Sequence, residues 1–387
     1  MNRNFKYRLY PNRTQGLALE RILDLHHQLY NAALEERREA YRKCRISLNY
    51  YDQANQLKAL RAQDSDMAGL NYSSCQQTLR KLDKAFQAFF RRLKAGEKSA
   101  GYPRFKSRHR YTTVEYRWGD GVRLKGKRLY VQNIGNLKVK WHREIPAQAT
   151  IQCAYFKRDA AAWYVIFSLD LPDVTPAPHP GSAVGIDVGL NSLVALSNGQ
   201  TMENPRWYRS TEAKLVRAQR IVSRRKKFSG RWRKTVRNVA TLHRKVANQR
   251  LDWHHKLSRQ LTDTYRLIAL EDLNILGLSR SHLAKSVHDA GWGQLIALLT
   301  YKAENAGSQV VLVDPRLTSQ VCSQCGCVVP KDLSVRVHCC PECGVVLDRD
   351  VNAARNILHR ALLETARTEP TVTSLSMDGC SREAACL

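Results

Sequence analysis

The chain has 387 residues, of which 43% are hydrophobic, so it can bury the cores of roughly two or three compact units. This composition excludes a disordered protein. Lys and Arg number 63 against 34 Asp and Glu, and the resulting net charge of +29 repels itself unless a polyanion neutralises it. Nucleic acid is therefore the expected partner, and a basic protein of membrane surfaces is the alternative.

The compartment follows from hydropathy and from cysteine usage. No apolar run approaches the roughly 20 residues that span a bilayer, and residues 1–6 lack the apolar stretch of a signal peptide. Six of the eleven cysteines fall within Cys322–Cys343, which is typical of a metal site and not of a disulfide framework. We therefore expect no membrane partner and a location in a prokaryotic cytoplasm, beside the nucleoid when the protein is on DNA.

The N-terminal part of the chain changes its hydrophobic period twice. Residues 5–10 alternate apolar or aromatic side chains with basic ones, which predicts a short strand that ends at Pro11. Apolar residues between 14 and 95 follow helical spacing, and short β runs separated by turn residues fill 111–171. We predict a small β-barrel or curled sheet from residues 1–13 and 111–175, with a helical domain, 14–110, inserted into it.

A proline-rich linker separates this part from the rest of the chain. Four prolines between 172 and 181 disfavour helix and predict a domain boundary there. After the linker, strand-like and helical segments alternate, which indicates an α/β domain. The expected segments are strands at 182–186, 193–196, 265–270 and 309–313, and helices at 207–264 and 293–306. The segment 363–387 shows little periodicity and is expected to be disordered.

The helical region 207–264 is unusually basic. Between 209 and 259 the chain carries seventeen Lys or Arg but only two acids, Glu212 and Asp252. A solvated basic face is the alternative, but solvated faces usually mix charges of both signs, so we expect phosphate contacts here. The densest part of this track consists of Arg224, Arg225, Lys226, Lys227, Arg231, Arg233, Lys234 and Arg237.

Two cysteine pairs have the spacing of a metal ribbon. Cys322 and Cys325 form one C-x2-C turn, Cys340 and Cys343 form the other, and a glycine follows each pair. Two such turns present four thiolates to one tetrahedral ion, as zinc prefers. A redox function is the alternative for either pair alone, but not for two pairs in tandem. Four protein ligands leave no open position, so we expect a structural zinc. Three further candidate ligands lie nearby: Cys327, His338 and Cys339.

Three carboxylates follow apolar strands in the second half of the chain. They are Asp187, Glu271 and Asp350. Each has a plain alternative: Asp187 could cap a turn, Glu271 or Asp272 could be an exposed loop acid, and Asp348 or Asp350 could be a helix N-cap. As a set in a basic protein, they are what a phosphodiesterase needs to hold two Mg²⁺ ions, one to activate water and one to stabilise the leaving oxygen.

Several motifs extend this pattern over nearly the whole chain. They are Leu9-Tyr10-Pro11-Asn12, Gly101-Tyr102-Pro103-Arg104-Phe105, Gly185-Ile186-Asp187-Val188-Gly189, Leu270-Glu271-Asp272-Leu273, Asp289-Ala290-Gly291-Trp292-Gly293, the four cysteines, and Asp348-Arg349-Asp350-Val351-Asn352-Ala353-Ala354. In their order and spacing these motifs resemble the transposon-encoded TnpB (OrfB) family of RNA-guided endonucleases, ancestors of the type V CRISPR effectors.

The resemblance implies an RNA-guided endonuclease that cuts double-stranded DNA beside a short transposon-adjacent motif. Its RNase H-like (RuvC) nuclease domain would span 182–320 and 347–362, with the zinc ribbon, 321–346, inserted. The β-barrel would be the wedge domain and the helices the recognition domain. The family pattern also selects the catalytic, Mg²⁺-binding acids: Asp187, Glu271 in preference to Asp272, and Asp350 in preference to Asp348.

The resemblance further implies the partners. The chain would act as a monomer with a guide RNA derived from the transposon end, and the basic track would lie along the RNA–DNA heteroduplex, where contacts to the backbone leave sequence recognition to base pairing. Three positions are similar to those that touch the adjacent DNA motif in the family: Tyr50, Gln76 and Gln77.

Two other functions compete with this interpretation. A regulator with the same fold could bind nucleic acid without cutting it, although all three acids are present. An accessory transposase would need a His-x-His pair with a tyrosine nucleophile, and the adjacent pairs His26-His27 and His254-His255 lack the intervening residue.

Overall fold

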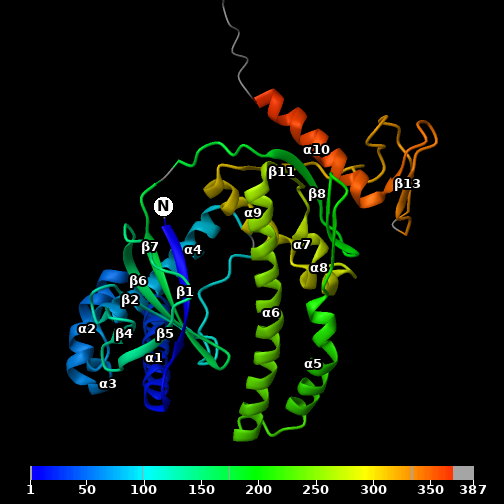
Figure 1. Ribbon diagram of the computed structural model, residues 1–387. Helices are drawn as coiled ribbons and strands as arrows, with labels where there is room; N and C mark the ends of the chain where they lie inside the picture. Colours follow the sequence, from blue (N-terminus) through cyan, green and yellow to red (C-terminus); the bar gives the residue numbers. More distant parts are fainter. Residues whose placement is uncertain (1, 98, 174, 333, 369–387) are drawn as a thin grey trace, which may run out of the picture. The chain divides into compact units, whose positions relative to one another are not determined.

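The computed structural model describes residues 2–97, 99–173, 175–332 and 334–368. The chain forms two compact units, residues 1–174 and 175–387 (Figure 1). The boundary between them falls within the proline-rich segment that the sequence predicts as a linker. No helix in the described ranges has the length and apolarity that a bilayer crossing requires.

The N-terminal unit contains an antiparallel sheet of seven strands. The strands are β1 (Asn2–Tyr10), β2 (Thr113–Arg117), β3 (Val122–Lys125), β4 (Arg128–Val131), β5 (Gly135–Lys140), β6 (Thr150–Asp159) and β7 (Ala162–Asp170), in the order β2-β6-β7-β1-β5-β4-β3. Strand β1 lies in the middle because its alternate side chains, Phe5, Tyr7 and Leu9, belong to the core. Among the described residues, the ladder leaves β2 and β3 as edges, so its hydrogen bonds form a sheet and do not close a barrel.

The inserted helices pack on this sheet. They are α1 (Arg13–Cys44), α2 (Tyr50–Gln63), α3 (Ser65–Ala68) and α4 (Tyr72–Lys94). Helix α1 begins with a capping box in which Asn12 and Gln15 each accept from the other's backbone amide. Buried leucines, among them Leu34 and Leu82, join α1 and α4 to the core of the sheet. The described residues from 95 to 112 form no helix, and the end of α4 at Lys94 agrees with the helical spacing seen in residues 14–95.

The second unit contains a mixed sheet of five strands. They are β8 (Ser182–Asp187), β9 (Ser192–Leu196), β10 (Thr201–Glu203), β11 (Tyr265–Glu271) and β12 (Gln309–Val313), in the order β10-β9-β8-β11-β12. The first three run antiparallel to one another, and β11 runs parallel to both β8 and β12. The two central strands, β8 and β11, therefore end at the same edge of the sheet.

Six helices and a small ribbon complete the second unit. The helices are α5 (Trp207–Ser223), α6 (Gly230–Thr264), α7 (Ile275–Leu278), α8 (Ala284–Ala290), α9 (Trp292–Ala306) and α10 (Arg349–Thr368); the ribbon pairs β13 (Val337–Cys339) with β14 (Val346–Asp348). The predicted single helical region 207–264 is two helices, because Phe228 adopts a left-handed φ of 66° and Ser229 caps α6. Helix α10 continues to Thr368, so disorder from residue 363 was predicted too early; residues 369–387 lie outside the described residues.

The sheet of the second unit buries both faces. Alternate side chains of each strand point to one face of the sheet, where Ile186 and Leu270 pack with Leu257 of α6 and Leu295 of α9. The side chains between them point to the other face, where Leu267 and Ala269 pack with Ile357 and Ala361 of α10. Asp187 and Glu271 occupy positions whose side chains point to this second face, so both carboxylates lie on the face that α10 covers.

Gly185 permits the close approach of α10. A Cβ atom at this position would lie 2.0 Å from the backbone oxygen of Ala354 and 2.8 Å from the Cβ of Leu358. Neither neighbour is a flexible side-chain end, so the helix itself would have to move away from β8. Glycine is therefore required here by packing and not by its backbone angles.

We predict that Gly185→Ala destabilises the second unit by at least about 2 kcal/mol, because the methyl group overpacks a backbone contact. Chemical denaturation of the full chain measures this change. Gly230→Ala is the matched control, because a Cβ at position 230 meets nothing within 4 Å. Equal stability of the two variants would contradict the packing argument.

Candidate functional site

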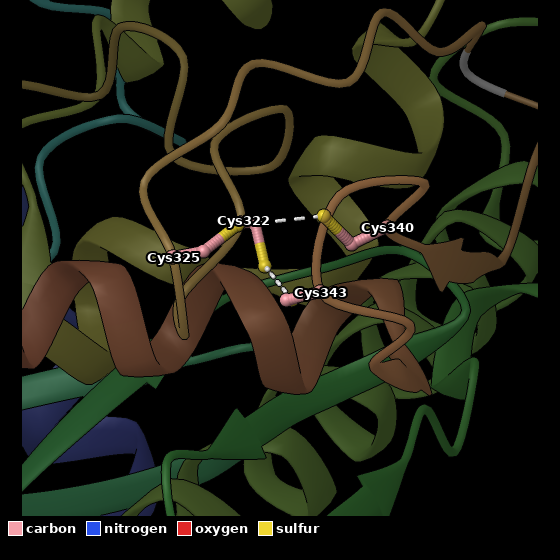
Figure 2. Close-up of side chains that lie close together, drawn as sticks. All are labelled: Cys322, Cys325, Cys340 and Cys343. Carbon is pink, nitrogen blue, oxygen red and sulfur yellow. Dashed lines mark hydrogen bonds between the residues drawn. The ribbon is translucent and has the colours of Figure 1, made fainter.

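Four cysteines of the ribbon converge on one point (Figure 2). The Sγ atoms of Cys322 and Cys343 are 3.6 Å apart, those of Cys325 and Cys340 are 3.5 Å apart, and all four lie within 4.8 Å of one another. Sulfurs at the corners of a tetrahedron around zinc, with bonds of about 2.3 Å, would be about 3.8 Å apart. The geometry fits a single tetrahedral ion.

The two cysteine turns have the same backbone structure. Gly326 donates its amide to the carbonyl of Cys322 at 2.9 Å, and Gly344 donates to Cys340 at 3.0 Å. Both glycines have left-handed φ angles, 77° and 72°, which other residues adopt at a cost. Of the described histidines, cysteines and acids, this quartet alone forms so close a group, so Cys327, His338 and Cys339 are not part of it.

The backbone also favours the ionised form of one of these thiols. Hydrogen bonds from the backbone at Cys343 and Glu342 lower the pKa of Cys340 to about 6. Backbone hydrogen bonds also lower the pKa of Cys325 and of Cys343, but burial and hydrogen bonds to neighbouring thiols outweigh them and raise it. The thiolate is the form that binds zinc, so Cys340 is prepared for a cation and the binding of an ion would displace protons from the other two thiols.

The three predicted acids come together on the α10 face of the sheet. Asp187 ends β8 and Glu271 ends β11, the adjacent parallel strand. Asp350 lies in the first turn of α10, and a Cβ at Gly189, two residues after Asp187, would be 3.7 Å from its Oδ2 atom. All three side chains are half-buried. Their oxygens do not form a group as close as the four sulfurs, and carboxylates around two cations must spread further than the ligands of one.

Electrostatics within this site favours the binding of a cation. Burial raises the pKa of Asp187 well above its usual range, and the charges of Glu271 and Asp350 raise it further. Burial also raises the pKa of Glu271 and of Asp350, the latter with help from the charge of Asp348. The folded protein therefore concentrates negative charge where water cannot fully solvate it, and a metal ion would relieve this repulsion.

The neighbouring acids have other positions. Asp348 accepts from the amides of Asp350 and Val351 at 2.8 and 3.2 Å, so it is the residue that caps α10. Asp272 is exposed and follows the end of β11. The alternatives that spacing alone left open thus differ in their geometry. Asp348 caps the helix, although its charge still raises the pKa of Asp187 and Asp350, and Asp272 is exposed beyond the end of the strand.

Three residues outside the predicted sets of ligands support both centres. Thr318, which is buried, donates its hydroxyl to Oε1 of Glu271 at 2.5 Å. Asn352 of α10 accepts from the amide of Ser323 and donates to the carbonyl of Val321, and Asn356 donates to the carbonyls of Thr318 and Val321. One helix therefore carries an acid of the site and also holds the ribbon. No pattern in the sequence identifies such pairs.

The basic track lies away from the acids. All eight residues from Arg224 to Arg237 are exposed, in the turn between α5 and α6 and in the first turns of α6 (Figure 1). Helix α6 runs from this end to β11, and its 35 residues correspond to about 50 Å. The structure therefore does not bring the basic track to the carboxylates.

The three residues predicted to touch the DNA motif lie near one another on the N-terminal unit. The guanidinium of Arg80 lies over the ring of Tyr50, 5.0 Å from its centroid, and Arg80 follows Gln76 by one helical turn on α4. Gln77, Arg80 and Lys81 line a cavity of about 250 Å³. Arg80 was not among the predicted residues.

Comparison with known proteins places the chain in a family. Models of protein families match residues 166–282 ("Probable transposase", OrfB of IS605), 292–357 ("Cas12f1-like, TNB domain") and 1–45 ("Helix-turn-helix domain"). The last name does not describe the structure, in which residues 1–45 form β1 and the single helix α1. The second match covers the ribbon and the first nine of the twenty residues of α10.

Two relatives align over almost their whole length, and both are described as "Putative RNA-guided DNA endonuclease". One, from Streptomyces pristinaespiralis, is 36% identical over 378 residues, which cover 95% of this chain and 91% of the relative. The other, InsQ of Escherichia coli K12, is 28% identical over 373 residues, with 92% and 91% covered.

A solved structure shares the fold. The mini-RNA-guided endonuclease CRISPR-Cas_phi3 superposes with a TM-score of 0.56 over 94% of this chain and 92% of that chain, at 8% sequence identity. Together with the near-complete alignment to the Streptomyces protein, this confirms the resemblance that the motifs indicated. The chain belongs to the TnpB (OrfB) family of transposon-encoded proteins.

Proposed function

We propose that the chain is an RNA-guided endonuclease that cuts double-stranded DNA for a transposon, at the site formed by Asp187, Glu271 and Asp350. The observation that carries this proposal is the convergence of three partly buried carboxylates, whose pKa values are raised, in a protein of net charge +29. The names of the two near-full-length relatives give the reaction and the guide.

The sheet of the second unit supports an RNase H-like (RuvC) assignment. Three antiparallel strands followed by two parallel ones, with the acids at the ends of the central pair, are the arrangement that this fold requires. In the same scheme the N-terminal sheet is the wedge domain, helices α1–α4 are the recognition domain, and 321–346 is the zinc ribbon.

The roles of this chain's residues follow from the geometry. Two Mg²⁺ ions, when bound, supply an activated water and stabilise the leaving oxygen. Asp187 and Asp350 approach each other from β8 and α10 and provide the charge that holds such ions. Thr318 fixes the orientation of Glu271 through the hydrogen bond at 2.5 Å. A zinc ion in the ribbon would be structural, since the four cysteines would supply all four of its ligands.

Nucleic acid is brought to these acids by other surfaces. The basic track at the end of the α5–α6 hairpin provides exposed cations without base-reading motifs, which fits contacts to the backbone of a guide–target heteroduplex. The group of Tyr50, Gln76 and Gln77, joined by Arg80, is the proposed contact to the short DNA motif. A non-cleaving regulator of the same fold is the competing function, and the following experiment separates the two.

We predict that Asp187→Ala lowers the cleavage rate of guide-matched plasmid by at least about a thousandfold, while guide-dependent binding stays within about twofold of the wild type. The rate is measured in Mg²⁺ with protein purified together with its RNA. Asp272→Ala removes an exposed acid next to Glu271 and should change the rate by less than about threefold. Equal cleavage by the wild type and Asp187→Ala would remove Asp187 from the catalytic site, and guide-dependent binding without any cleavage by the wild type would support the non-cleaving regulator.

The raised pKa of Asp187 predicts a dependence of stability on pH. In the metal-free protein the folded state holds this proton more tightly than the unfolded state, so stability falls as pH rises above the ordinary carboxyl range toward the raised pKa. Asp187→Asn should therefore melt at a higher temperature than the wild type near pH 8 and at a similar temperature near pH 4. Added Mg²⁺ should stabilise the wild type more than the variant; the reverse order would contradict a cation site here.

The four-cysteine site of the ribbon can be tested separately from the acids. Cys343→Ser should abolish the binding of about one zinc ion per chain and lower the melting temperature, because a ligand of the tetrahedral site is lost. Cys327→Ser is the matched control, since Cys327 lies in the ribbon but outside the close group. Mass spectrometry of the intact protein measures the zinc content of both variants. Loss of zinc from Cys327→Ser would show that the ligands are wrongly assigned.

A further inference from the structure

A polar cavity of about 460 Å³ lies beside the acids in the second unit. Its polar lining consists of Asn191, Asn204, Arg206, Arg209, Ser286 and Asp289. Arg209 is the first residue of the basic region 209–259, and the other five were assigned no function above; the cavity is separate from the ribbon and from the dense part of the track, Arg224 to Arg237.

The cavity adjoins the acid site through the turn between β8 and β9. Leu190 lines it and directly follows Gly189, where a Cβ would be 3.7 Å from Oδ2 of Asp350. The side-chain amide of Asn204 donates to the carbonyl of Leu190 at 3.0 Å, so this part of the cavity lining is hydrogen-bonded to the turn. A chain of phosphates that crosses the cavity would therefore continue toward the carboxylates.

Two arginines give the cavity its positive charge. The backbone of Arg206 is held in a left-handed conformation, φ 47°, and its amide donates to Asn204, but within the described ranges its guanidinium makes no hydrogen bond or ion pair. Arg209 forms a long ion pair with Glu212, at 4.0 Å, and Glu212 is paired more closely with Lys285. Among the described residues the Arg206 guanidinium is therefore unpaired, and that of Arg209 can bind an anion without breaking a short ion pair.

Asp289 fixes where these arginines lie. This carboxylate is 4% exposed and accepts from the amides of Tyr208 and Arg209 at 2.7 and 3.3 Å, so it caps α5 from a different helix. No side chain next to the start of α5 does so. Because Asp289 occupies the first amides of α5, a ligand would meet the guanidinium groups and not the helix N-terminus.

We propose that this cavity binds a backbone phosphate of the strand that enters the acid site, through Arg206 and Arg209, with Asp289 as a positioning residue. The inference rests on the proposed function for the identity of that strand. Its physical basis is the opposition of charges: three carboxylates repel a phosphodiester, and two guanidinium groups beside them offset this repulsion and hold the strand in place. Guanidinium forks match the geometry of phosphate oxygens.

The test compares Arg206→Gln/Arg209→Gln with the control Arg367→Gln, an exposed arginine of α10 outside both the cavity and the basic region 209–259. In the guide-loaded protein, the double variant should cut bound target about ten- to a hundredfold more slowly, while guide-dependent binding stays within about twofold. Arg206→Lys/Arg209→Lys should recover most of the rate, since the charge is kept. An unchanged rate, or an equal loss in the control, would overturn the proposal.

A second measurement does not depend on cleavage. In EDTA, the affinity of the guide-loaded protein for a short single-stranded oligonucleotide is measured as a function of salt. Loss of two phosphate contacts should weaken binding and reduce the slope of log affinity against log salt by about 1.4. An unchanged slope would overturn the proposed phosphate site even if the wild type cuts DNA. If the wild type does not cut but the slope changes, the nuclease proposal fails and the phosphate site stands.

Discussion

The contact between α10 and β8 determines where every proposed ligand of the second unit lies. At Gly185 the helix backbone approaches the strand so closely that no side chain fits between them. This contact sets the position of Asp350 opposite Asp187. It also sets the position of Asn352 and Asn356, which bind the backbone of the ribbon. A change in helix position would therefore disturb the acids and the ribbon together.

Opposite charges are separated in this molecule to a degree that its composition does not reveal. The sequence is strongly basic, yet in the acid site burial and the charges of the neighbouring carboxylates raise the pKa of Asp187, and Arg349 offsets this only in part. Such a region is unfavourable in the metal-free protein. It persists because the sheet and α10 are held by their own packing, and a cation would turn the repulsion into binding energy.

Much of this organisation could be predicted from the sequence, because the relevant signals are local. Alternation predicted β1, apolar runs predicted the strands that end in Asp187 and Glu271, prolines predicted the linker, and cysteine spacing selected the four cysteines that converge. Other features depend on contacts between distant segments. Asp289 caps a helix about 80 residues away in the chain, and Thr318 reaches Glu271 across 47 residues. No window of sequence contains such pairs.

The errors of prediction have physical causes as well. The interruption between α5 and α6 was missed because charge continues through it, whereas Phe228 changes the backbone direction. Asp348 and Asp350 are equivalent in spacing, and only the hydrogen bonds to the first turn of α10 show which one is the cap. The start of the tail was placed at 363 because its composition lacks periodicity, although the last turns of α10 need little burial to form.

The α5–α6 hairpin has a consequence for how the family can diversify. The first buried side chain of α6 is Val246, so roughly 24 Å of helix, including half of the basic track, supports no core. Substitutions there alter the attraction for a polyanion at almost no expense in folding stability. A lineage can therefore change the RNA that it binds through this hairpin. The sheet of the second unit stays the same, because at Gly185 not even one methyl group can be added.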